Sequence, residues 1–341
     1  MKSSTNTLPV GKLPPELLAR LLASAPVQDE RLLLGPGVGL DCAVVDLGST
    51  LLVFKSDPIT FATDEIGWYA VQVNANDIAT TGATPTWFLM TLLLPAKCTT
   101  TSLVEQISQQ VYEACEEIGV TVIGGHTEIS QGLDRPIVVG TLIGEVDREQ
   151  LITPRGAQPG DRILLTKGVP IEATSILARE FPDRLSGYLS PEEMAQARDY
   201  LYDPGISVLQ DARIATQAGR VTAMHDPTEG GLSSALWELA EACGLSISFD
   251  HQVVPISYLS QRICQVFEID PLSAIASGAL LLTTRREDVN PICQALEQNG
   301  IQCAEIGSVE SGPAKVWRIT ASGRELLPRP TRDEIARVFN S

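Results

Sequence analysis

The spacing of hydrophobic and polar residues alternates between two periods along the first half of the chain. Short runs of small and β-branched apolar residues, typical of buried strands, occupy 41–48, 50–59, 84–95, 120–125 and 136–146. Apolar residues at helical spacing separate these runs and predict helices from Pro14–Pro15, over 66–82 and over 100–119. The first half therefore has the pattern of a mixed α/β unit.

A stretch rich in proline, glycine and polar residues precedes a new strand at 162, so a domain boundary is predicted near Gly160. Beyond it, the pattern predicts helices around 171–180, 191–202, 206–218, 231–243 and 288–299. Strands are expected near 162–166, 221–224, 245–249, 278–284 and 303–309. The sequence predicts an N-terminal segment with a helix (1–34), a first α/β domain (35–159) and a second α/β domain (160–341).

Composition limits the partners of this protein. The net charge is −17, with 42 acidic against 25 basic residues, and such a field repels nucleic acid and anionic membrane surfaces. It also repels phosphorylated ligands, and the six lysines are scattered, so a bound polyphosphate would need metal ions to neutralise it. No apolar run approaches the roughly 20 residues needed to span a bilayer, and the N-terminus lacks a secretory core. We expect a cytoplasmic protein.

The seven cysteines do not indicate a disulfide framework or a zinc cluster. Their number is odd and no C-x-x-C pair occurs. Most of them lie in apolar patterns, where a free thiol behaves as a small buried hydrophobe.

Several acidic residues stand next to predicted strands. Asp41 precedes "CAVV", Asp57 ends "LLVFKSD", Asp77 follows Asn76 in "NANDIATTGATP", and Asp226 lies in "HDPTEGGL" after a strand. Loops at the ends of strands gather at one edge of an α/β sheet, and carboxylate oxygens there are suited to magnesium. Each residue alone also has an ordinary interpretation as a turn residue, a helix cap or a solvated side chain.

The order of these motifs is more specific than any one of them. G-x-D-x-A-V-V, K-S-D, N-D-x-x-x-x-G-A-x-P, G-G-x-T and D-P-T-x-G-G-L follow one another along the chain. This order resembles the AIR synthetase (PurM) superfamily, which includes HypE, thiamine-monophosphate kinase and selenophosphate synthetase. The resemblance covers nearly the whole chain from about Gly35, and no Walker P-loop motif is present.

The resemblance implies a two-domain α/β PurM-like fold in which the N-terminal domain forms a homodimer interface and ATP is held through Mg²⁺. The expected metal ligands are Asp41, Asp57 and Asp77. The expected nucleotide-binding residues are Lys12, Asn76, Gly124, Gly125, Thr127, Thr228, Gly230 and Gly231. The candidate catalytic residues are Asp226 and His126, which stands where relatives carry Asp or Glu.

"HDPTEGGL" and "TKGVPIEATSILA" most resemble HypE and AIR synthase-related proteins. HypE ends in a cysteine that receives a carbamoyl group, whereas this chain ends in "RDEIARVFNS" and its last cysteine is Cys303. The S-S-G-x-H-S-N-G run of AIR synthetases is also absent. Three functions stay open: a Mg-ATP-dependent enzyme acting on an unidentified amide-type or small-molecule acceptor, a non-catalytic ATP-binding maturation protein with a protein partner, and an AIR synthetase.

Overall fold

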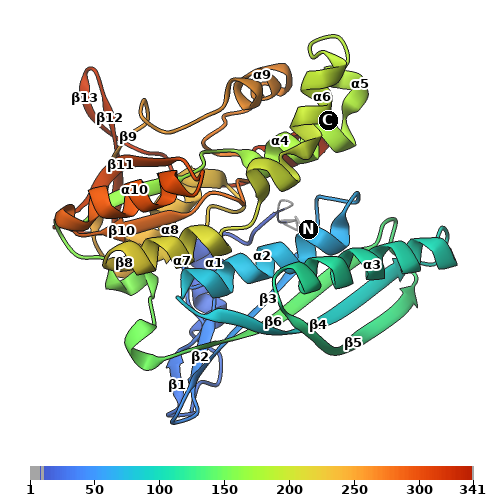
Figure 1. Cartoon of the computed structure of the whole chain (residues 1–341), viewed down its shortest axis with the longest axis horizontal. Coiled ribbons are helices and arrows are strands. Elements are labelled where there is room, and N and C mark those ends of the chain that lie inside the picture. Colours follow the sequence, from blue (N-terminus) through green and yellow to red (C-terminus); the bar gives the residue numbers. More distant parts are fainter. Residues whose placement is uncertain (1–7, 9–10, 340–341) are drawn as a thin grey trace, which may run out of the picture.

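The computed structural model describes residue 8 and residues 11–339. The described chain forms two halves, each built on a mixed β-sheet with helices packed against it (Figure 1). The predicted two-domain α/β fold is therefore confirmed. Among the residues described, no helix combines the length and the apolar character needed to cross a membrane.

The first sheet has six strands in the order β1-β2-β3-β6-β4-β5. The strands are β1 (Leu32–Leu34), β2 (Ala43–Asp46), β3 (Leu51–Ile59), β4 (Thr84–Pro95), β5 (Thr121–Ser130) and β6 (Ile137–Val146). Helices α2 (Ile66–Thr80) and α3 (Thr101–Glu117) cover one face, and α1 (Pro15–Leu22) lies outside this pair (Figure 1). Helix α3 is capped by the hydroxyl of Thr100, as its first residues predict.

Helix α2 is almost entirely buried, because it packs on β3 and β6, against α3, and against α7 (Leu209–Ala218) and β8 (Val221–His225) of the second half. Its close approach to the sheet requires glycine on β6. A Cβ on Gly140 would lie 2.5 Å from the amide nitrogen of Asn74 and 2.8 Å from the carbonyl oxygen of Ala70. Helix α2 therefore carries its last turns, with Asn76 and Asp77, into the boundary between the halves.

No described helix covers the opposite face of the first sheet (Figure 1). We call this surface the open sheet face. Paired strand residues share a face, and the register places mainly apolar, half-buried side chains here. The half-buried apolar side chains of the open sheet face include Phe54, Trp87, Leu89, Leu93, Ile137, Val139 and Ile143, and polar residues such as Ser56, Thr91 and Thr141 lie among them.

The second sheet has seven strands in the order β13-β12-β9-β11-β7-β10-β8. They are β7 (Arg162–Thr166), β8 (Val221–His225), β9 (Ser246–Asp250), β10 (Leu281–Thr284), β11 (Cys303–Glu310), β12 (Lys315–Thr320) and β13 (Gly323–Leu326). Helix α8 (Gly231–Cys243) packs with Ile163 and Leu165 on one face. Helices α7 (Leu209–Ala218) and α10 (Val289–Gln298) pack with Leu164 on the other. Alternating residues of β7 thus serve two cores.

A group of helices follows β7 beside the second sheet (Figure 1). It consists of α4 (Ile171–Glu180), α5 (Pro182–Leu185), α6 (Pro191–Asp199) and α9 (Tyr258–Phe267), and α11 (Ile335–Phe339) joins the same core. The sequence pattern did not predict β1, α5, α9, β12, β13 or α11. The strand predicted over 120–125 continues to Ser130, and the strand predicted from 278 begins at Leu281.

Candidate functional site

A pocket of about 320 Å³ lies between the two halves. The first half contributes the turn 37–41 and side chains from β3 and α2. The second half contributes the turn 228–230, part of α8 and the C-terminal residues 329–333, and Lys12 also borders the pocket. Segments from the beginning, the middle and the end of the chain therefore meet at one place.

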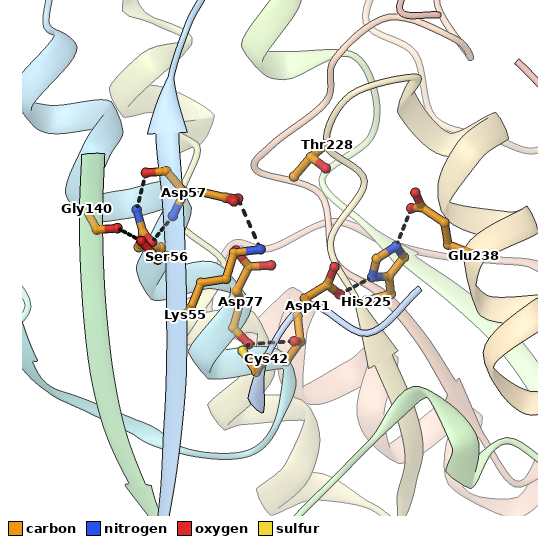
Figure 2. A network of polar contacts seen from close by, with 12 residues as sticks. Asp41, Cys42, Lys55, Ser56, Asp57, Asp77, Gly140, His225, Thr228 and Glu238 are labelled. Atoms are coloured by element: carbon orange, nitrogen blue, oxygen red, sulfur yellow. Dashed lines mark hydrogen bonds and ion pairs between the residues drawn. The ribbon is translucent and has the colours of Figure 1, made fainter. Parts of the chain in front are cut away.

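Lys55 and two aspartates form the side of the pocket that belongs to the first half (Figure 2). Lys55 and Asp57 are two residues apart on β3 and therefore point to the same side, toward α2. The amine of Lys55 lies 3.1 Å from Asp57 and 3.0 Å from Asp77. Burial disfavours the charged amine, but Asp77 and Asp57 outweigh it and hold the pKa of Lys55 well above its ordinary value. The carboxylates thus have a fixed cation between them.

His225 occupies the corresponding position on the other side (Figure 2). Its Nδ1 lies 2.6 Å from Asp41 and its Nε2 lies 2.9 Å from Glu238 on α8. Burial lowers the pKa of His225, but the two carboxylates outweigh burial and raise that pKa well above the ordinary value. The imidazolium donates to both acids. Burial likewise opposes ionisation of Asp41, yet the charge of His225 keeps the pKa of Asp41 low.

The turn before Asp41 explains why glycine precedes this carboxylate. Gly39 has a φ of +73°, and a Cβ there would lie 2.6 Å from the carbonyl oxygen of Glu238. The backbone of the turn therefore passes directly against α8, and Asp41 reaches His225 from the other half of the molecule.

Asp226 is a buried carboxylate whose oxygens accept no hydrogen bond from a described N–H group or hydroxyl, and the side chain that interacts with it is another acid, Asp77. Burial raises the pKa of Asp226 to about 6, and the charge of Asp41 adds to the effect. One side-chain atom each from Asp41, His225 and Asp226 lies within 4.8 Å of the others. Because both nitrogens of His225 donate to acids, the atoms available to a metal in this group are the carboxylate oxygens of Asp41 and Asp226. A buried acid without a hydrogen-bond donor needs an explanation, and a divalent cation bound by carboxylates supplies one. The residues present therefore fit a magnesium ion.

Thr228 and Gly230 lie on the pocket, at the turn that opens α8. Lys12 donates to the Thr228 hydroxyl (3.3 Å) and lies 3.5 Å from Glu238. Gly231 packs against the backbone of Leu272 and Ala274 rather than lining the pocket. Backbone N–H groups at such a helix start are suited to an anion.

The structure places the other predicted residues elsewhere. Asn76 is buried, and its amide donates to the carbonyl of Ile206 (2.7 Å) and accepts from the N–H of Val208 (2.8 Å). Both ends of this side chain therefore join α2 to the second half, although the sequence placed Asn76 with the nucleotide. Gly124, Gly125, His126 and Thr127 lie on the exposed strand β5 and do not line the pocket. The side chain of His126 is 65% exposed and lies 3.3 Å from Glu128.

Sequence reasoning did not identify three charged groups of the site: Lys55, His225 and Glu238. Lys55 and His225 both stand inside the motifs that carried the resemblance, K-S-D and "HDPTEGGL". Lys55 lies two residues before Asp57, and His225 lies one residue before Asp226. This closeness to an expected site residue was the available signal. The sequence contained no such signal for Glu238, because only the packing of α8 brings it to the site.

The fold and the pocket define a two-domain α/β protein with an acidic, glycine-bordered pocket between its halves. Residues 39–146 match the family model described as AIR synthase related protein, N-terminal domain, and residues 158–319 match its C-terminal domain. A putative hydrogenase expression/formation protein of Methanocaldococcus jannaschii is 30% identical over 317 residues, which cover 89% of this chain and 90% of that protein. The chain belongs to the AIR synthase-related family of the PurM superfamily.

Two further relatives are hydrogenase maturation proteins. Carbamoyl dehydratase HypE of Cupriavidus necator is 26% identical over 260 residues, covering 74% of this chain and 70% of that protein. A crystal structure of HypE in complex with ATP has a TM-score of 0.70 and 22% identity, covering 94% of this chain and 91% of that one. At this identity the structural similarity shows the shared fold.

Proposed function

We propose that this protein binds Mg-ATP in the pocket between its halves and uses the γ-phosphoryl group to activate an amide-type or other small-molecule acceptor. The observation that carries this proposal is the buried carboxylate of Asp226, which lies beside the acids Asp41 and Asp77 and accepts no hydrogen bond from a described N–H group or hydroxyl. The family membership supports the proposal, because the relative HypE has been crystallised with ATP.

The proposed metal ligands are Asp41, Asp57 and Asp77, with Asp226 beside them. Magnesium would neutralise the phosphates and orient them, which is the main requirement of phosphoryl transfer. The hydroxyl of Thr228 and the amine of Lys12 border the pocket and would bind phosphate oxygens, whereas the N–H of Gly230 is held by Asp333. The chain's own contribution is placement and charge compensation.

The acceptor comes from outside this chain in our proposal. Cys303, the last cysteine, lies at the start of β11 with its sulfur 3.0 Å from that of Cys293 on α10. It is held within the second sheet, away from the C-terminal residues that border the pocket. A carbamoyl transfer to Cys303 is therefore not part of the proposal.

We further propose that the protein is a homodimer joined through the open sheet face. Several half-buried apolar side chains there have no covering helix, and β5 is an exposed edge strand with Ile123 and Ile129 about half exposed. A second copy would cover both features. Gly124, Gly125, His126 and Thr127 would act as predicted only if this association carries them to a pocket.

Calorimetric titration with a non-hydrolysable ATP analogue tests the proposal. We expect binding that requires magnesium and is lost in Asp77→Asn, while Asp134→Asn, an exposed control, binds as the wild type does. Binding heat measured without magnesium would contradict the assignment. Equal affinity of the two variants for the ATP analogue would contradict it as well. Turnover would then be measured as phosphate release with amide and amine acceptors.

A second candidate function is nucleotide binding without turnover, in a maturation complex with a protein partner. The exposed position of His126, distant from the described pocket lining, favours it. Tight binding with no phosphate release in the presence of any acceptor would support this alternative.

A further inference from the structure

The C-terminal segment, residues 327–339, forms one wall of the pocket. It follows β13, and its residues 329–333 line the cavity. The segment lies beyond residue 319, where the match to the C-terminal family model ends. The pocket therefore has a wall that the family motifs do not include.

Hydrogen bonds attach this wall to the second half. The N–H of Leu327 donates to Val316, and the indole of Trp237 donates to the carbonyl of Leu327 (3.2 Å). Arg329 pairs with Glu241 on α8. The start of the segment is thus fixed to the sheet and to the helix that borders the pocket.

Asp333 holds the middle of the wall against the glycine turn. It is 2% exposed, and its two oxygens accept from the N–H of Gly230 (2.5 Å) and of Ile335 (2.7 Å). The N–H of Glu334 donates to Ser273 (3.1 Å). The wall and the proposed phosphate-binding turn are therefore one hydrogen-bonded unit.

The end of the wall packs against both halves. Ile335 and Ala336 are buried, and the ring of Phe339 lies 5.7 Å from that of Phe61 and 5.0 Å from that of Phe181. Phe61 follows β3 of the first sheet, whereas Phe181 follows α4. An apolar anchor on both sides keeps the segment in place along the whole length of the pocket.

The cations that line the pocket differ in whether a carboxylate already pairs with them. Lys12 pairs with Glu238, Lys55 pairs with Asp57 and Asp77, and Arg329 pairs with Glu241. For Arg332, which is exposed and lines the same pocket, the described structure gives no ion pair or hydrogen bond. Arg332 is thus the lining cation whose charge is not already compensated among the described residues.

We propose that Arg332 is a polyphosphate-binding residue and that the C-terminal segment is the fixed wall that presents it. This inference rests on the proposed function, because it requires a nucleotide in the pocket. A guanidinium group binds phosphate oxygens through two parallel N–H donors and keeps its charge at every physiological pH. In a protein of net charge −17, one uncompensated cation at the cavity has a large effect on anion binding.

The test compares Arg332→Ala and Arg332→Lys with Arg337→Ala in the full-length protein. Arg337 belongs to the same segment but pairs with Glu334 and does not line the pocket. Affinities for Mg-ATP and for adenosine are measured by calorimetry, together with thermal unfolding. We expect Arg332→Ala to weaken Mg-ATP at least tenfold and to leave adenosine affinity and the melting temperature unchanged. Arg332→Lys should recover part of the loss, and Arg337→Ala should match the wild type.

The outcomes separate the two proposals. Equal Mg-ATP affinity of the wild type and Arg332→Ala would overturn the role of Arg332 and leave the proposed function intact. A parallel loss of Mg-ATP and adenosine would also overturn it, because the residue would then support the pocket rather than bind phosphate. A wild type that binds neither ligand would overturn the proposed function and this inference together.

Discussion

Replacing Asn76 with alanine should weaken the connection between the two halves of the molecule. The substitution leaves the carbonyl of Ile206 and the N–H of Val208 without their side-chain partner at a position that excludes water. An unsatisfied buried polar group costs roughly 1–3 kcal/mol, so the two together should cost about 2–6 kcal/mol. At about 2–4 °C per kcal/mol for domains of this size, the melting temperature should fall by roughly 4–24 °C.

Thermal and urea unfolding measure this loss of stability, and two further variants serve as comparisons. Asn76→Asp keeps an acceptor for Val208 but loses the donor to Ile206, so it should also be destabilised. Asn299→Ala is the matched control, because that exposed amide donates only to Ala295 within its own turn. Its cost should stay within about 0.5 kcal/mol.

Ligand binding by the same variant decides between two roles for Asn76. If the side chain only joins the halves, folded Asn76→Ala should bind Mg-ATP with an affinity within a few-fold of the wild type. An unchanged melting temperature combined with lost nucleotide binding would refute our reasoning and restore Asn76 as a ligand.

Three further predictions concern the charges of the site and the open sheet face. Because burial places the pKa of Asp226 at about 6, above its unfolded value, wild-type stability should fall as pH rises from about 4 to about 6. Asp226→Asn should therefore be more stable than the wild type at pH 8, by on the order of 2 kcal/mol in urea unfolding, and should lose the thermal shift with Mg-ATP. His225 has a raised pKa, so its contribution is complete below about pH 6.5 and is lost as pH rises through the folded value; His225→Gln should cost about 3 kcal/mol at pH 6 and less at high pH. An equal cost at every pH would contradict a charged His225. Phe54→Glu on the open sheet face should yield monomers by light scattering, and a wild type that is itself monomeric would exclude the proposed dimer.

The aspartates of the site were predictable because the order of the motifs resembles a known family, and not because they follow strand ends: Asp57 lies within β3, which continues to Ile59, and Asp77 lies on α2. Asp41, Asp57 and Asp77 do border one pocket, and Asp226 lies beside Asp41. Their partners were less predictable. The pair between Asp41 and His225 joins residues 184 positions apart, and nothing local to either residue indicates the other.

Asn76 shows the limit of motif reasoning most clearly. It is adjacent to Asp77 in the sequence, but neighbouring residues of an α-helix point about 100° apart. Asp77 therefore faces Lys55, whereas Asn76 faces the loop before α7. The wall at 329–333 was not predicted for a different reason, since a short segment without strong periodicity acquires its position only from tertiary contacts.

The composite lining of the pocket has a consequence during protein synthesis. Residues 329–333 are translated after both sheets, whereas Lys12 is translated before them. Both sheets can form before residues 329–333 emerge, yet the cavity lacks one side until Asp333 emerges and meets Gly230. Nascent chains that still lack residues 329–333 should therefore not sequester the ligand.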